Sequence, residues 1–407
     1  MELRQCADKI ITASIAAVLP DEAVKRALEN KVFPGRVILI AAGKAAWQMA
    51  NAAYGCLGSR IDKGLVITKY HHAMGPIGNF RCFEAGHPVP DAHSFDATRE
   101  ALALVGNLTA QDTVLFLLSG GGSALFELPL VTGAELQSVT KQLLSCGADI
   151  VEINTIRKRL SAVKGGRFAL ACAPAQVFTV VLSDVLGDRL DMIASGPAYP
   201  DSSTATEALE IAKKYHLQMS AAAWDLLGQE TPKVLSNVTT VVTGSVKQLC
   251  DAAAQACREL GYEPTILTDQ LCCEARQAGS LLASYGKKHH GRKLAFIAGG
   301  ETVVKLTGTG KGGRNQELAL SAAMEIEGLE GVCVFSIGSD GTDGPTDAAG
   351  GYADGNTAAL LREQGIYIED VLQNNDAYHA LQRVGGLIIT GPTGTNVNDV
   401  AVVLING

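Results

Sequence analysis

Short runs of consecutive apolar residues recur along the chain, and stretches with a helical spacing of apolar residues separate most of them. Continuous apolar runs are typical of strands buried on both faces, and helices between such strands are typical of a parallel sheet covered on both sides. The pattern therefore predicts an α/β fold with a mostly parallel sheet in the first half of the chain. The runs that we interpret as its strands are residues 37–41, 64–68, 112–118 and 176–182.

A largely helical region, residues 201–228, separates these strands from a second group. We place a domain boundary near residues 230–240, which gives domains of residues 1–235 and 236–407. The length of 407 residues supports two domains, because a single core of this size is unusual. Without a repeat or a low-complexity linker, the domains are expected to pack closely. The strands expected in the second domain are residues 239–244, 294–298, 302–306, 331–337 and 386–390.

Composition and charge exclude several classes of partner. The net charge of −8 leaves no basic footprint for nucleic acid or an anionic membrane surface, and no apolar run reaches the ~18 residues of a membrane span. Residues 10–19 are apolar enough for a signal peptide core, but Glu2 and Asp8 precede them and helical spacing follows, so we expect amphipathic helices. The ten cysteines are scattered without zinc-site spacing, which favours reduced thiols in the cytoplasm.

Glycine-rich polar loops follow several predicted strands, at the ends where open α/β sheets bind ligands. After residues 37–41, Gly43 and Lys44 open a helix, and a helix amino terminus beside an ammonium makes a compact anion site. The alternative is a surface lysine after a tight turn.

A second loop, after residues 112–118, contains three consecutive glycines between two serines. Such a run costs backbone entropy, and it lets successive N–H groups point inward around a phosphate with the serine hydroxyls as further donors. A sharp strand-to-helix turn remains the alternative. The residues predicted to bind phosphate here are Ser119, Gly120, Gly121, Gly122 and Ser123.

Acidic side chains follow two further predicted strands. Asp184 and Asp188 come after residues 176–182, and Asp340 belongs to a loop with three aspartates, residues 338–347. One or two carboxylates together with phosphate oxygens and water suit Mg²⁺, and Asp184 lies nearer its strand. A structural role for Asp184 and Asp188 remains the alternative.

Basic residues are concentrated in residues 157–167, the densest basic segment of an acidic chain. Arg157, Lys164 and Arg167 cannot all face one side of a helix, so part of the segment is expected to be solvated. One or two of these charges, Arg167 among them, are expected to reach a carboxylate or phosphate.

Another glycine-rich stretch, residues 308–317, carries Lys311 and Arg314. Its glycines match the dinucleotide fingerprint literally, but Lys305 interrupts the preceding strand pattern and no acidic residue follows at the usual offset. The loop suits a polyphosphate equally well, because the planar guanidinium spreads the charge of a transferring phosphoryl group.

Taken in chain order, these loops resemble those of the class II glycerate kinases, the glycerate 2-kinase family whose carboxyl-terminal part is called the MOFRL domain. The resemblance implies a Rossmann-like amino-terminal domain, a smaller α/β carboxyl-terminal domain and an active site in the cleft between them. It also implies transfer of the γ-phosphoryl group of ATP to the 2-hydroxyl of D-glycerate, with a divalent metal. The matching segments are residues 86–91, 118–124, 160–166, 183–197, 299–302, 312–318, 336–351 and 390–399.

The resemblance carries site roles onto particular residues. Lys44 and Arg314 correspond to the residues regarded as catalytic in the family. ATP and Mg²⁺ are the implied cofactors, with Lys311 at the nucleotide phosphates and Asp184 or Asp340 at the metal. The residues that we expect to contact the substrate are Arg167, Asn315 and Glu301.

Two rival functions remain open. The first is an NAD(P)H-dependent hydroxypyruvate reductase, which would need the glycines of residues 308–313 as a nicotinamide nucleotide site. The second is a sugar-phosphate sensor without catalytic activity, although the sequence offers no DNA-binding module. The expected partners are small molecules, without nucleic acid or membrane, and the sequence is compatible with a homodimer.

Overall fold

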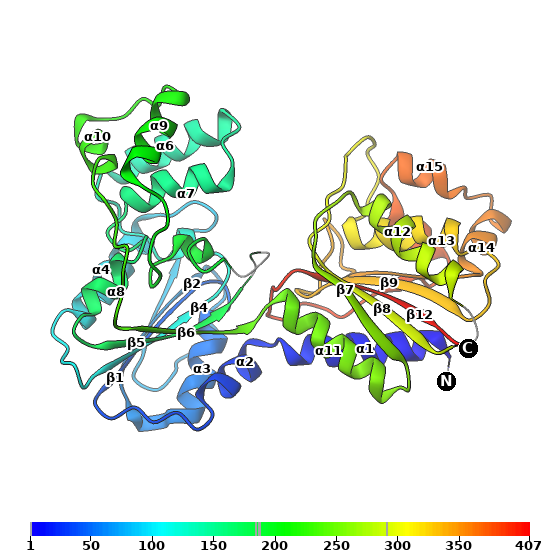
Figure 1. The fold of residues 1–407 in the computed structure, drawn as a ribbon, viewed down its shortest axis with the longest axis horizontal. Coiled ribbons are helices and arrows are strands. Elements are labelled where there is room, and N and C mark those ends of the chain that lie inside the picture. The colour runs from blue at the N-terminus through cyan, green and yellow to red at the C-terminus, as the bar shows by residue number, and fades with distance from the viewer. Residues whose placement is uncertain (1, 184, 186–188, 290–291) are drawn as a thin grey trace. The chain divides into compact units, whose positions relative to one another are not determined.

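The chain folds into two compact units in the computed structural model, which describes residues 2–183, 185, 189–289 and 292–407 (Figure 1). One unit comprises Pro20–Thr243, and the other combines Met1–Leu19 with Gly244–Gly407. This division differs from the expected domains of residues 1–235 and 236–407 at both ends of the first unit.

The first helix, α1 (Leu3–Ala17), accounts for the larger difference, because it packs against α11 (Val246–Glu259). Its Arg4 guanidinium donates hydrogen bonds to the carbonyl oxygens of Gly385 (3.0 Å) and Leu387 (3.2 Å). A helix from the start of the chain therefore belongs to the core of the carboxyl-terminal unit, which sequence order could not indicate.

A six-stranded sheet forms the centre of the Pro20–Thr243 unit. Its strands are β1 (Val37–Ala42), β2 (Ile61–Lys69), β3 (Arg81–Ala85), β4 (Thr113–Leu118), β5 (Gln176–Leu182) and β6 (Val238–Gly244). Their order is β3-β2-β1-β4-β5-β6, and the neighbouring pairs from β3 to β5 are parallel, as the apolar runs predicted. The edge strand β3 escaped prediction because four of its five residues are exposed or only partly buried.

Helices cover both faces of this sheet. On one face lie α2 (Pro20–Leu28) and α3 (Ala46–Leu57), and on the other lie α4 (Ala92–Val105) and α8 (Arg167–Cys172). The second face also carries three phenylalanine rings in mutual contact: Phe116, Phe126 and Phe168.

Four further helices of this unit form a layer with an apolar core of its own. They are α6 (Gly133–Ser145), α7 (Ile150–Arg159), α9 (Ala205–Lys214) and α10 (Ala221–Leu227), so the expected helical region 201–228 is confirmed. A side-chain oxygen that accepts a hydrogen bond from the backbone starts each helix. These N-cap residues are Thr132, Asp149, Thr204 and Ser220. Short helical turns complete the unit at η1 (Gly58–Arg60), α5 (Gly122–Leu125) and η3 (Ile193–Ser195).

The carboxyl-terminal unit contains a second six-stranded sheet, which is mixed. Its strands are β7 (Glu263–Leu271), β8 (Leu294–Gly300), β9 (Val332–Gly338), β10 (Gly350–Asp354), β11 (Leu387–Ile388) and β12 (Asp399–Ile405). Their order is β11-β10-β9-β12-β8-β7, with only the β7–β8 pair parallel among the pairs of described residues. The expected strand at residues 302–306 is wrong: this segment makes a single bridge at Val303, and its Leu306 is exposed.

Helices also cover both faces of the mixed sheet. Figure 1 shows α1 and α11 on one face and α12 (Ala275–Lys288) and α13 (Arg314–Glu325) on the other. Three shorter helices share a further apolar cluster with α13. They are α14 (Thr357–Glu363), α15 (Ile368–Gln373) and α16 (Ala377–Arg383).

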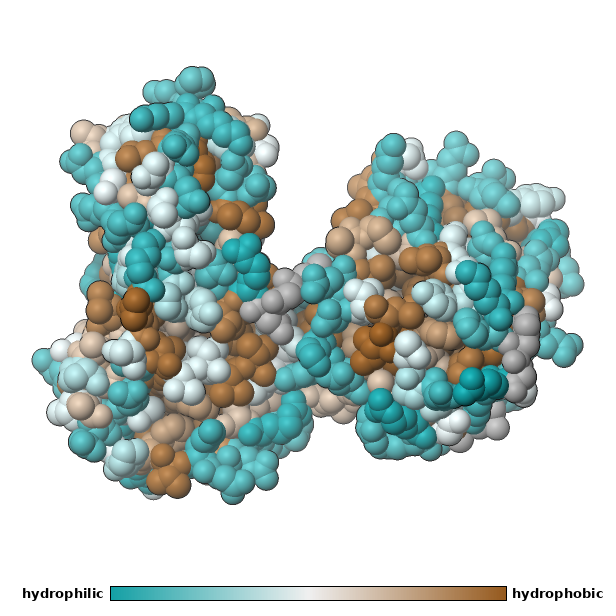
Figure 2. Space-filling model, in the orientation of Figure 1, coloured by the Kyte–Doolittle hydropathy of each residue, from teal (hydrophilic) through white to brown (hydrophobic). Residues whose placement is uncertain are grey.

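Figure 2 shows hydrophobic residues on one face of the molecule in separate groups among hydrophilic ones. Among the described residues, no helix combines the length and hydropathy that crossing a bilayer requires.

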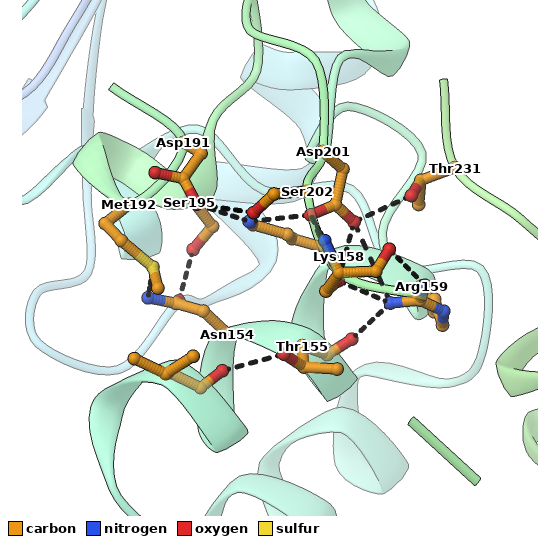
Figure 3. A network of polar contacts seen from close by, with 12 residues as sticks. Asn154, Thr155, Lys158, Arg159, Asp191, Met192, Ser195, Asp201, Ser202 and Thr231 are labelled. Atoms are coloured by element: carbon orange, nitrogen blue, oxygen red, sulfur yellow. Dashed lines mark hydrogen bonds and ion pairs between the residues drawn. The ribbon is translucent and has the colours of Figure 1, made fainter. Parts of the chain in front are cut away.

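The basic segment 157–167 is not a solvated face, because Lys158, Arg159 and Lys164 are buried. Figure 3 shows how Asp201 neutralises the first two of these charges. The Lys158 ammonium lies 2.9 Å and the Arg159 guanidinium 3.8 Å from carboxylate oxygens of Asp201, whose side chain is fully buried. Thr231 donates a further hydrogen bond to the same carboxylate. Helical spacing gives no sign of this partner, because Asp201 lies outside α7.

The start of α13 depends on a carboxylate from another loop. Its N-cap residue Gly313 has no side chain to accept hydrogen bonds, and Asp343 accepts them from the backbone N–H groups of Asn315 and Gln316. Asp343 is 2% exposed, and burial raises its pKa to about 6. The loop 338–347 therefore contributes a structural carboxylate to the second unit.

Replacing Asp201 by asparagine is expected to destabilise the protein by about 3–5 kcal/mol, because Lys158 and Arg159 would lose their shared buried carboxylate. The midpoint of urea unfolding, followed by circular dichroism, measures this loss. Asp225→Asn is the matched control, since Asp225 lies exposed on α10. Equal midpoints for the two variants would show that the buried cluster contributes no stability.

The Asp343 carboxyl is expected to make stability depend on pH. Its folded pKa lies above the ordinary value of 3.8, so between about pH 4 and pH 6 the folded state holds a proton that the unfolded chain releases. The free energy of unfolding should therefore fall by at most about 3 kcal/mol, relative to Asp343→Asn, as the pH rises through this window. Urea unfolding of both proteins at a series of pH values measures the difference. A difference that does not change with pH would contradict the assignment.

Candidate functional site

The turn after β1 places Lys44 beside the glycine-rich loop after β4. Gly43 has φ +129°, and a Cβ on it would lie 2.2 Å from the Ser119 Oγ, so only glycine fits. The backbone N–H of Lys44 donates to the Gly120 carbonyl (2.9 Å), and that of Ala45 donates to the Ser119 hydroxyl (3.1 Å). The structure thus brings together two groups of residues that the sequence indicated separately.

The glycine-rich loop itself leaves backbone donors available. Gly121 has φ +84°, a left-handed conformation that glycine adopts at little cost, and α5 begins at Gly122. The N–H groups of Gly120 and Gly121 donate to no acceptor among the described residues. The Lys44 ammonium, for its part, forms no ion pair with a described carboxylate. An unpaired cation beside free N–H groups can receive an anion such as phosphate.

His87 is a member of this group that sequence reasoning missed. A Cβ on Gly121 would lie 3.1 Å from the Lys44 Cγ and 3.2 Å from the His87 Nε2, so both side chains pack against the glycine. Burial and the Lys44 charge lower the pKa of His87, which keeps its imidazole neutral at neutral pH. His87 lies in residues 86–91, one of the segments that resemble the glycerate kinase family. No local pattern in this segment indicated that it lies close to Lys44.

In the other unit, Arg314 is held by two carboxylates. Its guanidinium donates a bidentate pair of hydrogen bonds to Asp399 (2.6 and 2.9 Å) and lies 3.0 Å from the Glu301 carboxylate. Asp399 is buried, and burial raises its pKa despite the guanidinium. The sequence indicated Arg314 and Glu301, whereas Asp399 stood out only as the end of a polar loop.

Lys311 and Asn315, which flank Arg314, have protein partners. The Lys311 ammonium lies over the Tyr378 ring, 4.1 Å from its centroid. Asn315 is buried, where its side chain accepts a hydrogen bond from Ser336 and donates one to Asp343. The Asn315 side chain therefore has its own structural partners at both ends.

The glycines of residues 308–313 lack the setting of a dinucleotide fingerprint, because no strand precedes them. The Gly308 N–H donates to the Asn375 side chain (2.9 Å), and the Gly310 N–H donates to the Asn374 carbonyl (2.9 Å). A Cβ on Gly308 would lie 2.4 Å from the Asn374 backbone. Gly308 and Gly310 permit close packing against another segment, and their N–H groups are not available to a pyrophosphate.

The structure gives Arg167, an expected contact of the substrate, hydrogen-bond partners within the protein. Its guanidinium donates hydrogen bonds to the carbonyl oxygens of Lys158, Arg159 and Ser161 at distances of 2.6–3.1 Å. These carbonyls lie at or just beyond the carboxyl end of α7, where helix carbonyls have no intrahelical partner. Arg167 thus completes the end of this helix.

The residues expected at the metal are only partly described. Asp184 lies outside the described residues. The Asp340 carboxylate accepts hydrogen bonds from the backbone N–H (2.9 Å) and hydroxyl (3.1 Å) of Thr342. Among the described residues, no three acidic, histidine or cysteine side chains are grouped as metal ligands. The available donors fit only a Mg²⁺ ion that is bound by one or two carboxylates. Phosphate oxygens and water would complete its coordination shell.

Comparison with known proteins places this geometry in a family. Residues 6–228 match the model of a family described as "Domain of unknown function (DUF4147)", and residues 294–399 match the MOFRL family. A D-glycerate 2-kinase of Thermotoga maritima is 56% identical, over 99% of this chain and 98% of that protein. A crystal structure of a glycerate kinase from the same organism superposes with a TM-score of 0.96 at 54% identity and covers 99% of both chains.

A relative from Agrobacterium vitis, 41% identical over 91% of this chain and all of that protein, has a name that refers to hydroxypyruvate reductase. Its identity is lower than that of the Thermotoga kinase, with which this chain shares both sequence and fold over nearly its whole length. Both halves of the chain match family models in the expected order. The chain therefore belongs to the glycerate 2-kinase family, with a carboxyl-terminal MOFRL domain.

Proposed function

We propose that this protein transfers the γ-phosphoryl group of ATP to the 2-hydroxyl of D-glycerate, giving 2-phosphoglycerate and ADP. The observation that supports it most directly is the Lys44 side chain packed against Gly121, where the N–H groups of Gly120 and Gly121 have no acceptor among the described residues. The name of the Thermotoga relative supports the acceptor and the position of transfer.

The reaction forms one bond and breaks one. The 2-hydroxyl oxygen of glycerate attacks the γ-phosphorus, the bond from that phosphorus to the bridging oxygen breaks, and ADP leaves with the electron pair while the hydroxyl proton is released. Negative charge on the transferring group is stabilised by donors already oriented in the protein, and such stabilisation is usually the largest contribution to catalysis. We assign this part to Lys44 and the loop of Ser119–Ser123 in one unit. Arg314 in the other unit is assigned the same type of role.

We assign Mg²⁺ to Asp184 or Asp340, where it would neutralise phosphate charge. Glu301 and Lys311 remain proposed contacts of substrate and nucleotide. A cytoplasmic location is also proposed. It is supported by the ten cysteines, which are all free.

Coupled assays test the proposed activity against the reductase alternative. With ATP, MgCl₂ and D-glycerate, the protein should release ADP, and phosphorus NMR of the product should show phosphate on carbon 2. With NADH and hydroxypyruvate, absorbance at 340 nm should stay constant, because the N–H groups of Gly308 and Gly310, two of the three fingerprint glycines, are hydrogen-bonded within the protein. Oxidation of NADH without ADP formation would overturn the proposal.

Replacing Lys44 by methionine is expected to lower kcat by about 10²–10³-fold, which is typical for the loss of one oriented group at the transition state. Lys44 has no ion pair with the described carboxylates, so the thermal unfolding midpoint should change little. Lys63→Met is the matched control, since Lys63 is exposed on β2. Arg314→Ala is a less specific test of the role of Arg314, because the buried Asp399 would lose its cationic partner. A kcat within twofold of the native value would remove Lys44 from the mechanism.

A further inference from the structure

Two side chains of α7, one helical turn apart, reach the loops of the candidate site. The Asn154 side-chain oxygen accepts a hydrogen bond from the Ser195 hydroxyl (2.8 Å), which in turn lies 3.3 Å from the Ser123 hydroxyl. The Arg157 guanidinium donates a hydrogen bond to the Ser123 carbonyl (3.0 Å). Both contacts converge on Ser123, the last residue of the glycine-rich loop.

Arg157 differs from its neighbours on the helix in having no anionic partner. Lys158 and Arg159 both lie within 4 Å of Asp201. Among the described residues, by contrast, no carboxylate lies within ion-pairing distance of Arg157, and its Nε is buried without a hydrogen bond. Burial accordingly lowers the pKa of Arg157. A cation that is partly buried and has no carboxylate partner among the described residues carries a desolvation cost, which is rare in a purely structural position.

The surroundings of Arg157 leave one positive charge in excess. The carboxylate whose charge acts on the Arg157 guanidinium is that of Glu127. One oxygen of this carboxylate already lies 3.3 Å from the Lys164 ammonium. Both of these side chains are fully buried. Burial, together with the like charge of Arg157, lowers the pKa of Lys164 to about 8. Two cations therefore face one anion beside the glycine-rich loop, and an additional anion would balance them.

We propose that Arg157 is an anion-binding residue of this site, which receives an oxyanion group of a substrate together with the Ser123 hydroxyl. The guanidinium suits this role, since its planar arrangement of donors matches a carboxylate or a phosphate and one of them already holds the Ser123 carbonyl. One guanidinium nitrogen of Arg167, the expected receptor of the glycerate carboxylate, is already hydrogen-bonded to carbonyl oxygens at the end of α7. The identity of the substrates rests on the proposed function. Within it, the oxyanion is either the carboxylate of D-glycerate or a phosphate of ATP.

The test measures binding and turnover for two variants. Arg157→Gln removes the charge but retains an N–H donor for the Ser123 carbonyl, and Arg157→Lys retains the charge but loses the planar fork. Lys141→Gln is the matched control, because it removes one positive charge from an exposed position on α6. For each protein, isothermal titration calorimetry with D-glycerate and with ATP gives Kd, steady-state assays give KM and kcat, and thermal unfolding reports the fold.

Arg157→Gln should raise the Kd and KM of one substrate at least tenfold, and Arg157→Lys should raise them less. An effect confined to D-glycerate assigns the carboxylate, and an effect confined to ATP assigns a phosphate. Unchanged Kd values in a folded Arg157→Gln protein would overturn the proposal and leave Arg157 as a brace of the loop. If Arg157→Gln does not fold, Arg157→Lys decides, because unchanged binding in that variant would also overturn it.

If the proposed function is wrong, the experiments give a different set of results. If the native protein releases no ADP, titration with inorganic phosphate and with D-glycerate still tests Arg157. Binding that weakens in Arg157→Gln and not in Lys141→Gln would support the anion site without the kinase activity. Binding of both anions that is equal in all three proteins would reject the site.

Discussion

The parallel pairing of β1 with β4 is the constraint on which the candidate site depends. Its register sets Ala42 opposite Leu118, so the two strands end together and the turns that follow them meet. The hydrogen bond from the Lys44 N–H to the Gly120 carbonyl joins those turns, and Gly43 permits the contact because it has no Cβ. Lys44 and the glycine-rich loop are neighbours as a consequence of this pairing, although a long stretch of chain separates them.

Electrostatic balance separates structural charges from candidate functional ones. The buried charges of Lys158 and Arg159 are paired with the opposite charge of Asp201, which also accepts hydrogen bonds from Lys158 and Thr231, as buried ions generally require. Lys44 and Arg157 have no such partner among the described residues, and both lie at the glycine-rich loop. In a protein of net charge −8, a local surplus of positive charge beside free N–H groups is what an anionic substrate requires.

Much of the site was visible in the sequence because glycines and charged residues directly after apolar runs are unusual. Lys44, the loop of Ser119–Ser123 and Arg314 were found on this ground. Asp343 and Asp399 could not be assigned, because their roles depend on partners in the first turn of α13: Asn315, Gln316 and Arg314. Arg167 was expected to contact the substrate. Its carbonyl partners at the end of α7 could not be foreseen, because no sequence pattern indicates them.

The sequence by itself determined the local elements of this protein: the buried strands of the first sheet, the helices between them and the loops rich in glycine. These follow from side-chain periodicity and backbone freedom, which act over a few residues. Only the tertiary structure decided that α1 belongs with the carboxyl-terminal unit, that β12 lies between β8 and β9, and that Lys158 and Arg159 are buried against Asp201. The physical reason is that burial and charge pairing depend on which distant segments meet, and no local pattern records that.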